Sequence, residues 1–487
     1  MTNKLGIGII TYNRKSILSL TIENIRKFTN SDFEFVIADD GSSDGTIEYL
    51  NNSGIKYITG VNKGISWNRN RALWYLKNEK NCENIIILED DCSPNEFGWE
   101  KQWIEAIENF GHINYMPEGS IENDNDISSG SGTPNDPFIA PMHQALCVGY
   151  SSRALDFVGY LDIRFKKYGE EHVEHTHRFL RAGYGGLIQH LRPERGQLYY
   201  LRGGLSISHS ESHGNNDLIS YNKDIHEQIK NDPIYRSPWR NDSQMFEFRN
   251  EIEKTKNIPY PEYDFQNNQY DRFISLGGNE NFGRTINSVF HTNEKSIFDE
   301  ILVPFHSLVD FFNCGFNKLL STESLYKYHN TLRCKETLVI YNKSPMNEAQ
   351  SQEIIENIIE SKENYNKMIL NMDNICESDQ KILFIREWND GLFYEGMHRP
   401  KNTMVANFKL LADAISNKYP NLDYKILFLN FGDAILNDHR MIFSNTDCAD
   451  NCDETTKISS ISHIMESLNI KVMYHDSANS NLEQPAC

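Results

Sequence analysis

Positive charge is scarce in this sequence. Lysine and arginine total 48 against 68 aspartates and glutamates, which gives a formal net charge of −20. A protein that binds nucleic acid needs a basic surface to neutralise phosphates, so we expect no nucleic-acid partner. The composition is still compatible with small anionic ligands that a metal ion and a few arginines hold locally.

Long apolar stretches are missing as well. The sequence has no window of 18 apolar residues and no signal-peptide core before the strand expected at residue 5, so it predicts no transmembrane helix. Its nine cysteines are scattered and odd in number, unlike those of a disulfide framework. We therefore expect a cytoplasmic protein, with peripheral contact to the inner face of a membrane and self-association into a homo-oligomer both left open.

Two glycine motifs that bind nucleotide phosphates are absent. Gly6 and Gly8 form a GxG, but Thr11 stands where a dinucleotide-binding loop requires its third glycine, and both glycines lie inside an expected strand. A P-loop sequence does not occur either. The sequence therefore excludes a dinucleotide-binding loop and a P-loop.

Strands and helices alternate along the first part of the chain. Apolar runs predict strands at 5–10, 33–40, 55–60 and 84–91, with helical segments and short connections between them. This alternation is typical of βαβ units. It predicts an α/β fold with a Rossmann-like, mostly parallel sheet and flanking helices.

The same pattern restarts near residue 270, with strong strands expected at 381–388 and 424–432. The length of 487 residues is enough for more than one domain. We expect an N-terminal domain over 1–230, a linker with peripheral helices over 231–269, a second α/β domain over 270–475 and a disordered tail over 476–487.

Three consecutive acids follow the fourth expected strand. The run from Ile85 to Leu88 fits a buried strand of a parallel sheet, and Glu89, Asp90 and Asp91 come next. Ligands of such sheets gather at the carboxyl ends of the strands, and adjacent carboxylates suit Mg²⁺ or Mn²⁺. Taken alone, the stretch is explained equally well by a solvated acidic turn.

Four segments in register resemble the nucleotide-sugar glycosyltransferases of family 2. They are IITYNR (9–14), VIADDGSSDGT (36–46), NKGISWNRNRAL (62–73) and ILEDD (87–91). The resemblance implies a GT-A fold, a nucleoside-diphosphate sugar as donor, and Mn²⁺ or Mg²⁺ as cofactor.

The resemblance also implies roles for single residues. Asp40 would accept a hydrogen bond from the base, and Arg69 would face the nucleotide, where a guanidinium suits phosphates and planar groups; an exposed helix charge is the alternative for Arg69. Asp91 would bind the metal between the two phosphates, with Asp90 or Glu89 reaching the ribose or a metal-bound water. The full set of expected nucleotide-sugar contacts is Thr11, Tyr12, Asn13, Arg14, Asp40, Asn62, Gly64, Arg69 and Asp90.

The family usually carries its catalytic base in a Glu-Asp pair at a helix start, which corresponds here to YGEEHVEHTHRFLRAGYG (168–185). Alignment on Arg178 places Glu171 and His172 at the pair, whereas alignment on Gly169 gives Glu170 and Glu171. Glu171 fits both and is the expected base for the acceptor hydroxyl, with His172 and Glu170 as alternatives. A charged helix start that the helix dipole favours is the other interpretation.

Histidines in LSISHSESHG (205–214) are candidates to complete the metal site. In several GT-A enzymes a downstream histidine does so, and neutral imidazole can bind beside carboxylates. The expected metal ligands are therefore Asp91, Glu89 and His209, with His213 behind them. A structural histidine is the alternative.

The segments SLGGNE (275–280), SIFDE (296–300) and LFIREW (383–388) resemble bacterial domains described as papain-like cysteine peptidases. Glu280 stands where those domains usually have cysteine, and a carboxylate cannot replace a thiolate as nucleophile. His329 is a candidate partner residue. We interpret this domain as a partner-binding, acceptor-recognition or assembly module, with a second transferase or hydrolase activity left open.

Together these features predict a metal-dependent, inverting glycosyltransferase. It would move a sugar from a nucleoside-diphosphate sugar, with a UDP-sugar favoured, to a hydroxyl of a surface glycan or glycolipid. Two alternatives stay open: a non-catalytic protein that binds nucleotide sugars or glycans, and a hydrolase whose activity lies in the C-terminal domain.

Overall fold

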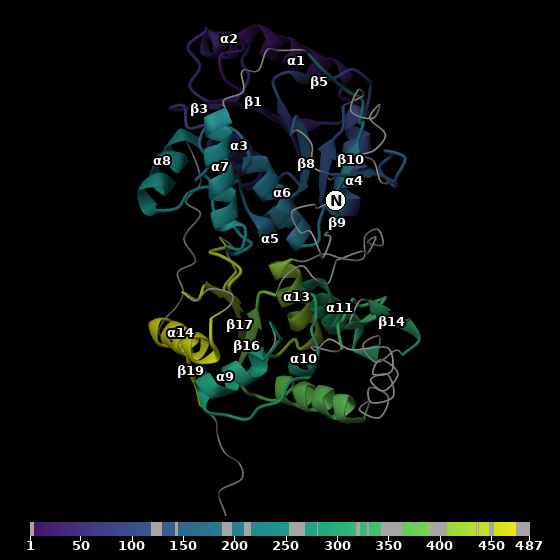
Figure 1. Ribbon diagram of the computed structural model, residues 1–487, viewed down its shortest axis with the longest axis vertical. Helices are drawn as coiled ribbons and strands as arrows, with labels where there is room; N and C mark the ends of the chain where they lie inside the picture. Colours follow the sequence, from purple (N-terminus) through teal and green to yellow (C-terminus); the bar gives the residue numbers. More distant parts are fainter. Residues whose placement is uncertain are drawn as a thin grey trace, which may run out of the picture. The chain divides into compact units, whose positions relative to one another are not determined.

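The computed structural model describes residues 4–117, 129–141, 145–187, 197–208, 216–252, 268–279, 281–317, 322–328, 331–341, 363–389, 407–434, 436, 438–447 and 452–473 (Figure 1). The described residues fall into two compact units. The N-terminal unit takes those within Met1–Ile258, Asp390–Asn407 and Asp433–Ile435, and the C-terminal unit takes those within Pro259–Asn389, Phe408–Gly432 and Leu436–Cys487. Both units combine helices with a sheet, which confirms the predicted α/β class.

A nine-stranded sheet forms the centre of the N-terminal unit. Its strands are hydrogen-bonded in the order β3 (Tyr57–Thr59), β2 (Phe33–Asp39), β1 (Leu5–Thr11), β4 (Asn84–Glu89), β8 (Cys147–Ser151), β6 (His112–Tyr115), β10 (Gln197–Leu201) and β7 (Phe138–Ala140), with β9 (Gly186–Leu187) against β10. The first four strands of this order are parallel, and β8 runs antiparallel to β4 and β6. The predicted mostly parallel sheet is confirmed, and the antiparallel pairings of β8, β7 and β9 are additions to it.

Eight helices are described in this unit: α1 (Lys15–Phe28), α2 (Thr46–Asn52), α3 (Ile65–Trp74), α4 (Trp99–Phe110), α5 (Ser152–Val158), α6 (Glu171–Arg181), α7 (Asn216–Ile229) and α8 (Asp242–Ile252). The chain of α3 continues as a π-helical turn, Tyr75–Glu79. β5 (Cys92–Pro94) follows β4 in sequence and forms a short antiparallel pair with β11 (Leu205–Ile207).

Successive residues of β1 face opposite sides of the sheet. Ile7 joins the buried cluster that contains Ile22 of α1. On the other side, a Cβ added to Gly8 would lie 3.1 Å from Cβ of Ala72 in α3, and one added to Gly6 would also meet buried side chains. The GxG of the sequence therefore allows α3 to pack closely against the sheet.

Four parallel strands form the sheet of the C-terminal unit, in the order β13 (Arg272–Ser275), β16 (Ile382–Glu387), β17 (Tyr424–Leu429) and β18 (Met441–Ser444). The predicted strands at 381–388 and 424–432 are confirmed as β16 and β17. Smaller pairs are β12 (Gln269–Tyr270) with β19 (Lys471–Val472), and β14 (Leu325–Tyr328) with β15 (Thr331–Cys334).

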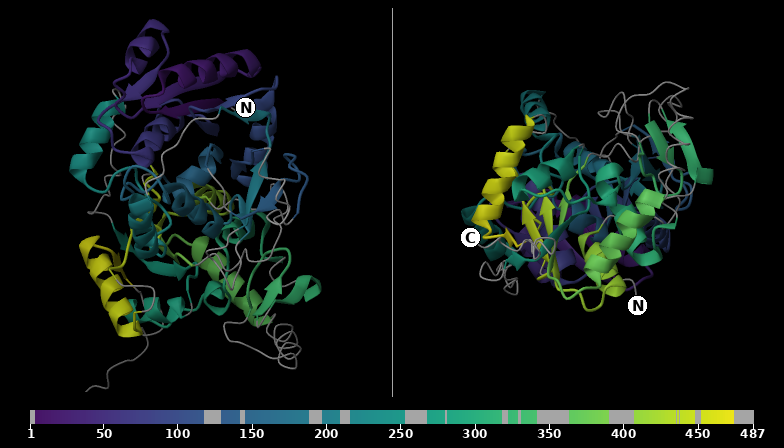
Figure 2. Two further views of the ribbon diagram at one scale, coloured as in Figure 1. Left: turned by 45° about the horizontal axis from the view of Figure 1, so that its top comes forward. Right: turned by 90° about the horizontal axis from the view of Figure 1, so that it is seen from below.

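Helices α9 (Phe282–Phe290) and α14 (Glu454–Ser467) lie side by side in this unit, and α11 (Phe305–Cys314) lies beside α13 (Phe408–Lys418) (Figures 1 and 2). The short helix α10 (Ile297–Glu300), a 3₁₀ turn, Thr322–Ser324, and a helical segment at residues 363–376 are also described there. None of the helices in the described ranges has the length and apolar character needed to span a bilayer.

Cysteine pairing differs in one place from the expectation. The described cysteines that are free are Cys82, Cys92, Cys147, Cys314, Cys334 and Cys376. Cys452 is disulfide-bonded, and the scattered cysteine spacing did not predict this bond.

Candidate functional site

Three neighbouring strands of the N-terminal unit end at one edge of its sheet. The register pairs Thr11 of β1 with Asp39 of β2, and Ile10 of β1 with Glu89 of β4. Residues that directly follow these strands therefore lie close together. The carboxyl edge of a parallel sheet is where such folds bind ligands.

Asp90 and Asp91 both bind the guanidinium of Arg14 at this edge. Arg14 donates from Nη1 to Asp90 Oδ1 and to Asp91 Oδ2, at 2.9 Å in both cases. The Thr11 hydroxyl donates to Asp90 Oδ2 at 2.7 Å. Burial raises the pKa of the Asp90 carboxyl above its usual value, although the bonds from Thr11 and Arg14 counteract this. Two acids and one guanidinium thus form a compact, largely buried group.

This group fits a divalent metal that is held partly by its substrate. Two carboxylates converge on a single positive charge, and Mg²⁺ in phosphate-binding sites commonly takes one or two carboxylates together with substrate phosphates. Within the described ranges, no group of three or more His, Cys, Asp or Glu side chains could hold a metal ion by itself. Asp90 and Asp91 would therefore need oxygens of a bound diphosphate to complete the coordination. The predicted ligand His209, like His213, lies outside the described residues.

Asp40 is fixed from several sides just beyond β2. Its carboxylate accepts hydrogen bonds from the backbone N–H of Lys63 at 3.0 Å and of Gly64 at 2.8 Å. It also accepts one from Arg71 Nη1 at 3.2 Å. Burial nevertheless raises the pKa of Asp40 above its usual value, because the bonds offset the desolvation only in part. The predicted base contact is therefore a rigidly held carboxylate.

Gly64 is needed for close packing as well as for its N–H. Its φ is +91°, and a Cβ there would lie 2.5 Å from Cα of Lys167. Ile65 N–H donates to the Lys167 carbonyl at 2.7 Å, so the two loops are in direct contact. Asn62, two residues earlier, lines an open pocket of about 390 Å³ together with Trp67 and other residues.

Tyr12 and Asn13 differ in what they contact. Asn13 has a φ of 54° and exchanges two hydrogen bonds with the loop after β2: its N–H donates to Ser42 Oγ, and its Oδ1 accepts from Ser43 N–H, both at 2.7 Å. Tyr12 is 47% exposed. Asn13 thus shapes the turn, and Tyr12 is accessible to a ligand.

Arg69 faces Glu89 rather than the Asp90–Asp91 pair. The guanidinium is fully buried; its Nη2 donates to Glu89 Oε1 at 3.3 Å and to the Ala145 carbonyl at 3.1 Å. The buried Tyr150 hydroxyl interacts with this guanidinium, whose Nε and Nη1 form no further hydrogen bond, and the buried Oε2 of Glu171 has no hydrogen-bond partner. Burial, with the charges of Asp90, Asp91 and Glu171 added, raises the pKa of Glu89 to about 7 in spite of Arg69. Buried polar atoms without partners call for an explanation, and a bound ligand supplies one.

The three candidate bases at the start of α6 have different surroundings. Glu170 lies 3.0 Å from Nδ1 of His226 in α7. His172 is buried, and burial together with Arg69 lowers its pKa well below the usual value. Glu171 is buried with one oxygen unused, and burial raises its pKa while Arg69 counteracts this. Of the three, Glu171 combines an unused oxygen with proximity to Arg69.

Arg178, the residue on which α6 was aligned, anchors the helix. It forms a buried ion pair with Glu174, at 2.7 Å from Nε to Oε1, and donates to the carbonyls of Val158 at 2.6 Å and Tyr160 at 2.7 Å. These bonds fasten α6 to the end of α5. They position the helix without reaching the strand edge.

The sequence did not indicate that Thr21 and Arg71 contact the site. Thr21 of α1 donates to the Asp90 carbonyl at 2.6 Å, and Arg71 of α3 bonds Asp40. Arg69 and Arg71 are two residues apart and so lie on different sides of the helix. The pattern NRNR contained both arginines but gave no sign of which one reaches Asp40.

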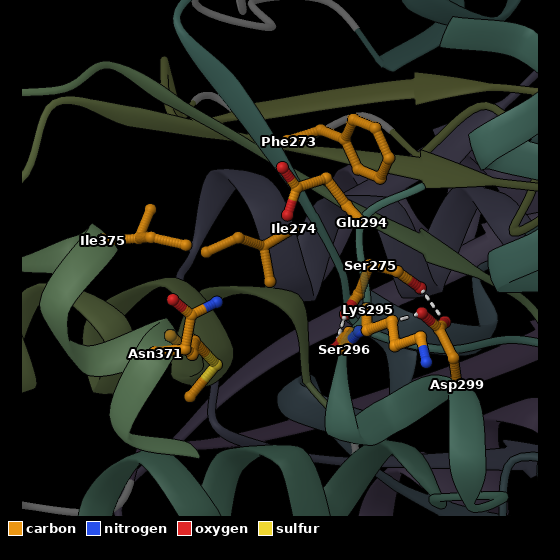
Figure 3. A pocket seen from close by; sticks show the side chains of 10 residues that line it. Phe273, Ile274, Ser275, Glu294, Lys295, Ser296, Asp299, Asn371 and Ile375 are labelled. Carbon is orange, nitrogen blue, oxygen red and sulfur yellow. Dashed lines mark hydrogen bonds between the residues drawn. The ribbon is translucent and has the colours of Figure 1, made fainter. Parts of the chain in front are cut away.

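The C-terminal unit contains a small cavity of about 20 Å³ at the end of β13 (Figure 3). Beside it, Ser275 Oγ donates to Asp299 Oδ1 at 2.5 Å, and Ser296 Oγ donates to the Ser275 carbonyl at 2.7 Å. Ser296 and Asp299 form the capping box of α10. The cavity has room for only about one water molecule and is too small for a substrate. The role of Ser296 and Asp299 is therefore to stabilise the start of α10. The candidates Glu280 and His329 lie outside the described residues.

Residues 7–141 match the model of the family described as Glycosyl transferase family 2. The match begins in β1 and ends just after β7. It therefore contains Asp40, Arg69, Asp90 and Asp91, whereas α6 and α8 lie beyond it.

Two curated proteins are similar to parts of the chain. The chain is 25% identical over 246 residues to a chondroitin synthase of Pasteurella multocida (strain Pm70), which covers 40% of this chain and 25% of that protein. It is 27% identical over 147 residues to a GalNAc(5)-diNAcBac-PP-undecaprenol beta-1,3-glucosyltransferase of Campylobacter jejuni, which covers 28% of this chain and 46% of that protein. The chain thus spans about a quarter and about half of the length of these relatives.

Solved structures resemble it more remotely. The mannosyltransferase PcManGT from Pyrobaculum calidifontis, in complex with GDP-Man and Mn²⁺, has a TM-score of 0.30 at 13% identity and covers 37% of this chain and 53% of its own. GalNAc-T7 with UDP, GalNAc and Mn²⁺ has a TM-score of 0.35 at 13% identity, with 51% and 54% covered. A likeness of this degree says nothing about a substrate. The match to the family 2 model thus covers residues 7–141, and the strand ends within this matched region form the site described above.

Proposed function

We propose that the protein is a metal-dependent, inverting glycosyltransferase that moves a sugar from a nucleoside-diphosphate sugar to a hydroxyl of a glycan or glycolipid. One observation carries the proposal: Thr11, Asp40 and the Asp90–Asp91 pair meet at one sheet edge inside the region that matches family 2. A base contact and a metal contact at neighbouring strand ends suit the two halves of a nucleotide diphosphate.

Asp40 supports a donor whose base carries a ring N–H. Its Oδ1 accepts two hydrogen bonds, from Lys63 and Arg71, while Oδ2 accepts one, from Gly64. A carboxylate oxygen can accept two, so Oδ2 has capacity for one more donor. Uracil and guanine present a ring N–H on their pairing edge, whereas neutral cytosine and adenine present a ring acceptor there and can donate only from their exocyclic amino group. A UDP-sugar, which the family resemblance favours, and a GDP-sugar both fit this contact.

Asp90 and Asp91 are the proposed metal ligands on the diphosphate side. When bound, Mn²⁺ or Mg²⁺ would offset the negative charge of the departing diphosphate. Arg14 lies on both carboxylates and is placed to contact a phosphate once a metal occupies them.

Glu171 is the proposed base. As the acceptor oxygen bonds to the anomeric carbon, the bond from that carbon to the diphosphate oxygen breaks, the diphosphate leaves with the electron pair, and the hydroxyl proton passes to Glu171. This single displacement inverts the anomeric centre. The raised pKa of Glu171 suits proton uptake, and its buried, unpartnered Oε2 supports a ligand at the start of α6.

The relatives support a polymer or lipid-linked acceptor. One is named a chondroitin synthase and the other a glucosyltransferase that acts on an undecaprenol-linked oligosaccharide. We propose an acceptor of this general kind and leave the sugar and linkage unassigned.

Donor turnover tests the proposal. Purified protein with Mn²⁺ and a panel of UDP- and GDP-sugars is expected to release nucleoside diphosphate, slowly with water and faster with an acceptor. Asp91→Ala is expected to lower this rate by about a hundredfold or more, and Asp453→Ala, an exposed helix cap of the C-terminal unit, should leave it unchanged. Absence of turnover with every donor, despite tight nucleotide binding, would instead indicate a non-catalytic nucleotide-sugar-binding protein.

A further inference from the structure

Glu251 lies in the last turn of α8, beyond the region that matches family 2, and contacts that region through Arg71, 180 residues away in sequence. Its Oε1 accepts from Arg71 Nη2 at 2.9 Å, and its Oε2 accepts from Arg71 Nε at 3.0 Å. Oε2 also accepts from the indole N–H of Trp67 at 2.7 Å. A two-point contact of this kind fixes the plane of a guanidinium.

The other side of the same guanidinium holds Asp40. Arg71 Nη1 donates to Asp40 Oδ1 at 3.2 Å and to the carbonyl of Asp39 at 3.1 Å. The arginine is fully buried, so water cannot replace either carboxylate. Glu251 and Asp40 are therefore coupled through one immobilised side chain.

Gly60 has no side chain, and this leaves room for the contact between Glu251 and Arg71. A Cβ added to Gly60, directly after β3, would lie 2.0 Å from Glu251 Oε1 and 2.6 Å from Arg71 Nη2. Gly60 in turn supports the loop after Asp40, since a Cβ on Gly41 would lie 2.8 Å from the Gly60 carbonyl. The ends of β2 and β3 are thus built around the Glu251–Arg71 contact.

The position of α8 does not depend on Glu251 alone. Phe248 packs edge-on against Trp67 and Trp74, with ring centroids 5.3 and 6.0 Å apart, and Trp239 lies 5.1 Å from Trp74. An acid in the last turn of a helix is unfavourable for the helix dipole, so Glu251 does not serve the stability of α8 itself. Its removal should therefore leave the helix in place and loosen Arg71 at Nε, where Glu251 is its hydrogen-bond partner, while Nη1 and Nη2 keep their bonds to Asn68 and Val61.

We infer that Glu251 is a positioning residue for the donor base: it holds Arg71, and through Arg71 it fixes the Asp40 carboxylate. The inference rests on the proposed function, because it takes Asp40 as the contact to the base. It gives a role to a helix that lies outside the family match.

Calorimetric titrations in Mn²⁺ test this role with two probes, UDP and pyrophosphate, since only UDP carries a base. Glu251→Gln is expected to weaken UDP binding about tenfold and to change pyrophosphate binding by less than about twofold, within ordinary mutational scatter. Glu227→Gln is the matched control: it removes the same charge from the exposed side of α7, where Glu227 pairs with Lys230, and should leave both affinities unchanged.

A double-mutant cycle separates positioning from a general effect on the fold. If Glu251 acts through Asp40, Glu251→Gln adds no further loss of UDP affinity in an Asp40→Asn background. Glu251→Asp keeps the charge with a shorter reach and should give an intermediate loss; it decides the matter if the glutamine variant does not fold. Equal losses for UDP and pyrophosphate, or fully additive losses in the cycle, would overturn the inference.

The two proposals fail in different ways. If the wild-type protein binds neither UDP, GDP nor CDP, the proposed function fails and this inference falls with it. If the wild type binds UDP and Glu251→Gln binds it as tightly, the inference about Glu251 fails while the proposed function stands.

Discussion

Arg14 Nη1 lies 2.9 Å from Asp91 Oδ2, so a guanidinium sits against the carboxylate that we assign to the metal. A cation there competes with Mn²⁺ for the same negative charge. We expect Arg14→Gln to tighten the binding of Mn²⁺ alone by about tenfold. A titration of free Mn²⁺ followed by electron paramagnetic resonance measures this directly. Arg26→Gln, a like change in the last turn of α1, is the control, and unchanged or weaker Mn²⁺ binding by Arg14→Gln would speak against the shared site.

Glu171 is expected to act in the chemical step and not in donor binding. Glu171→Gln keeps the size of the side chain but cannot take a proton, so kcat for transfer should fall by about a hundredfold or more while the Kd for UDP stays the same. Glu170→Gln, one residue earlier and directed at His226, should keep most of the activity. The assignment of the base would be wrong if the two variants exchanged these phenotypes.

Gly64 offers a test of the loop that holds Asp40. Gly64→Ala would place a Cβ 2.5 Å from the Lys167 backbone at a φ of +91°, and should destabilise the N-terminal unit by about 2 kcal/mol or more. Gly54→Ala is a matched control, because Gly54 also has a positive φ, +62°, but nothing lies within 4 Å of its Cβ position; it should cost about 1 kcal/mol.

Unfolding followed by tryptophan fluorescence reports mainly on the N-terminal unit, since every tryptophan except Trp388 lies there. Equal destabilisation by the two glycine substitutions would show that the contact between Gly64 and Lys167 is not tight.

Features with a local sequence pattern could be predicted, whereas contacts between distant segments could not. The apolar runs around Ile7 and Ile86 define β1 and β4 well, because a strand buried on both faces is apolar throughout. The acids after β4 were placed correctly at the strand edge for the same reason. Pattern could not decide between Arg69 and Arg71, since that depends on how α3 is rotated against the sheet. Glu251 was out of reach, because its contact joins segments far apart in the chain.

Buried His112 and half-buried His177 predict a loss of stability in acid. Burial lowers the pKa of His112 to about 3 and that of His177 to about 4, whereas both titrate near 6.5 in the unfolded chain. Below that value the unfolded chain binds more protons than the folded one, so their contribution to stability is complete above pH 6.5 and is lost as the pH falls towards 4. Each such histidine adds a slope of up to about 1.4 kcal/mol per pH unit.

Replacing His112 tests the sign of this effect. Its ring stacks on Phe179 with centroids 4.3 Å apart, so His112→Phe is accommodated by shape although it loses the bond to the Gly149 carbonyl. The variant is expected to be less stable at pH 7.5 but to show a shallower decline between pH 6.5 and 5, measured as chemical unfolding at several pH values. A decline as steep as that of the wild type would remove His112 from the explanation.

The central claim is that the edge formed by β1, β2 and β4 binds a nucleoside diphosphate with a divalent metal. Calorimetric titration of the intact protein with UDP, GDP and CDP, each with and without Mn²⁺, tests it most directly. We predict Mn²⁺-dependent binding of UDP or GDP, weaker binding of CDP, and a loss of the Mn²⁺ dependence in Asp91→Asn. Binding that does not depend on Mn²⁺ and is unchanged in Asp91→Asn would contradict the account. Absence of binding of UDP, GDP and CDP would contradict it as well.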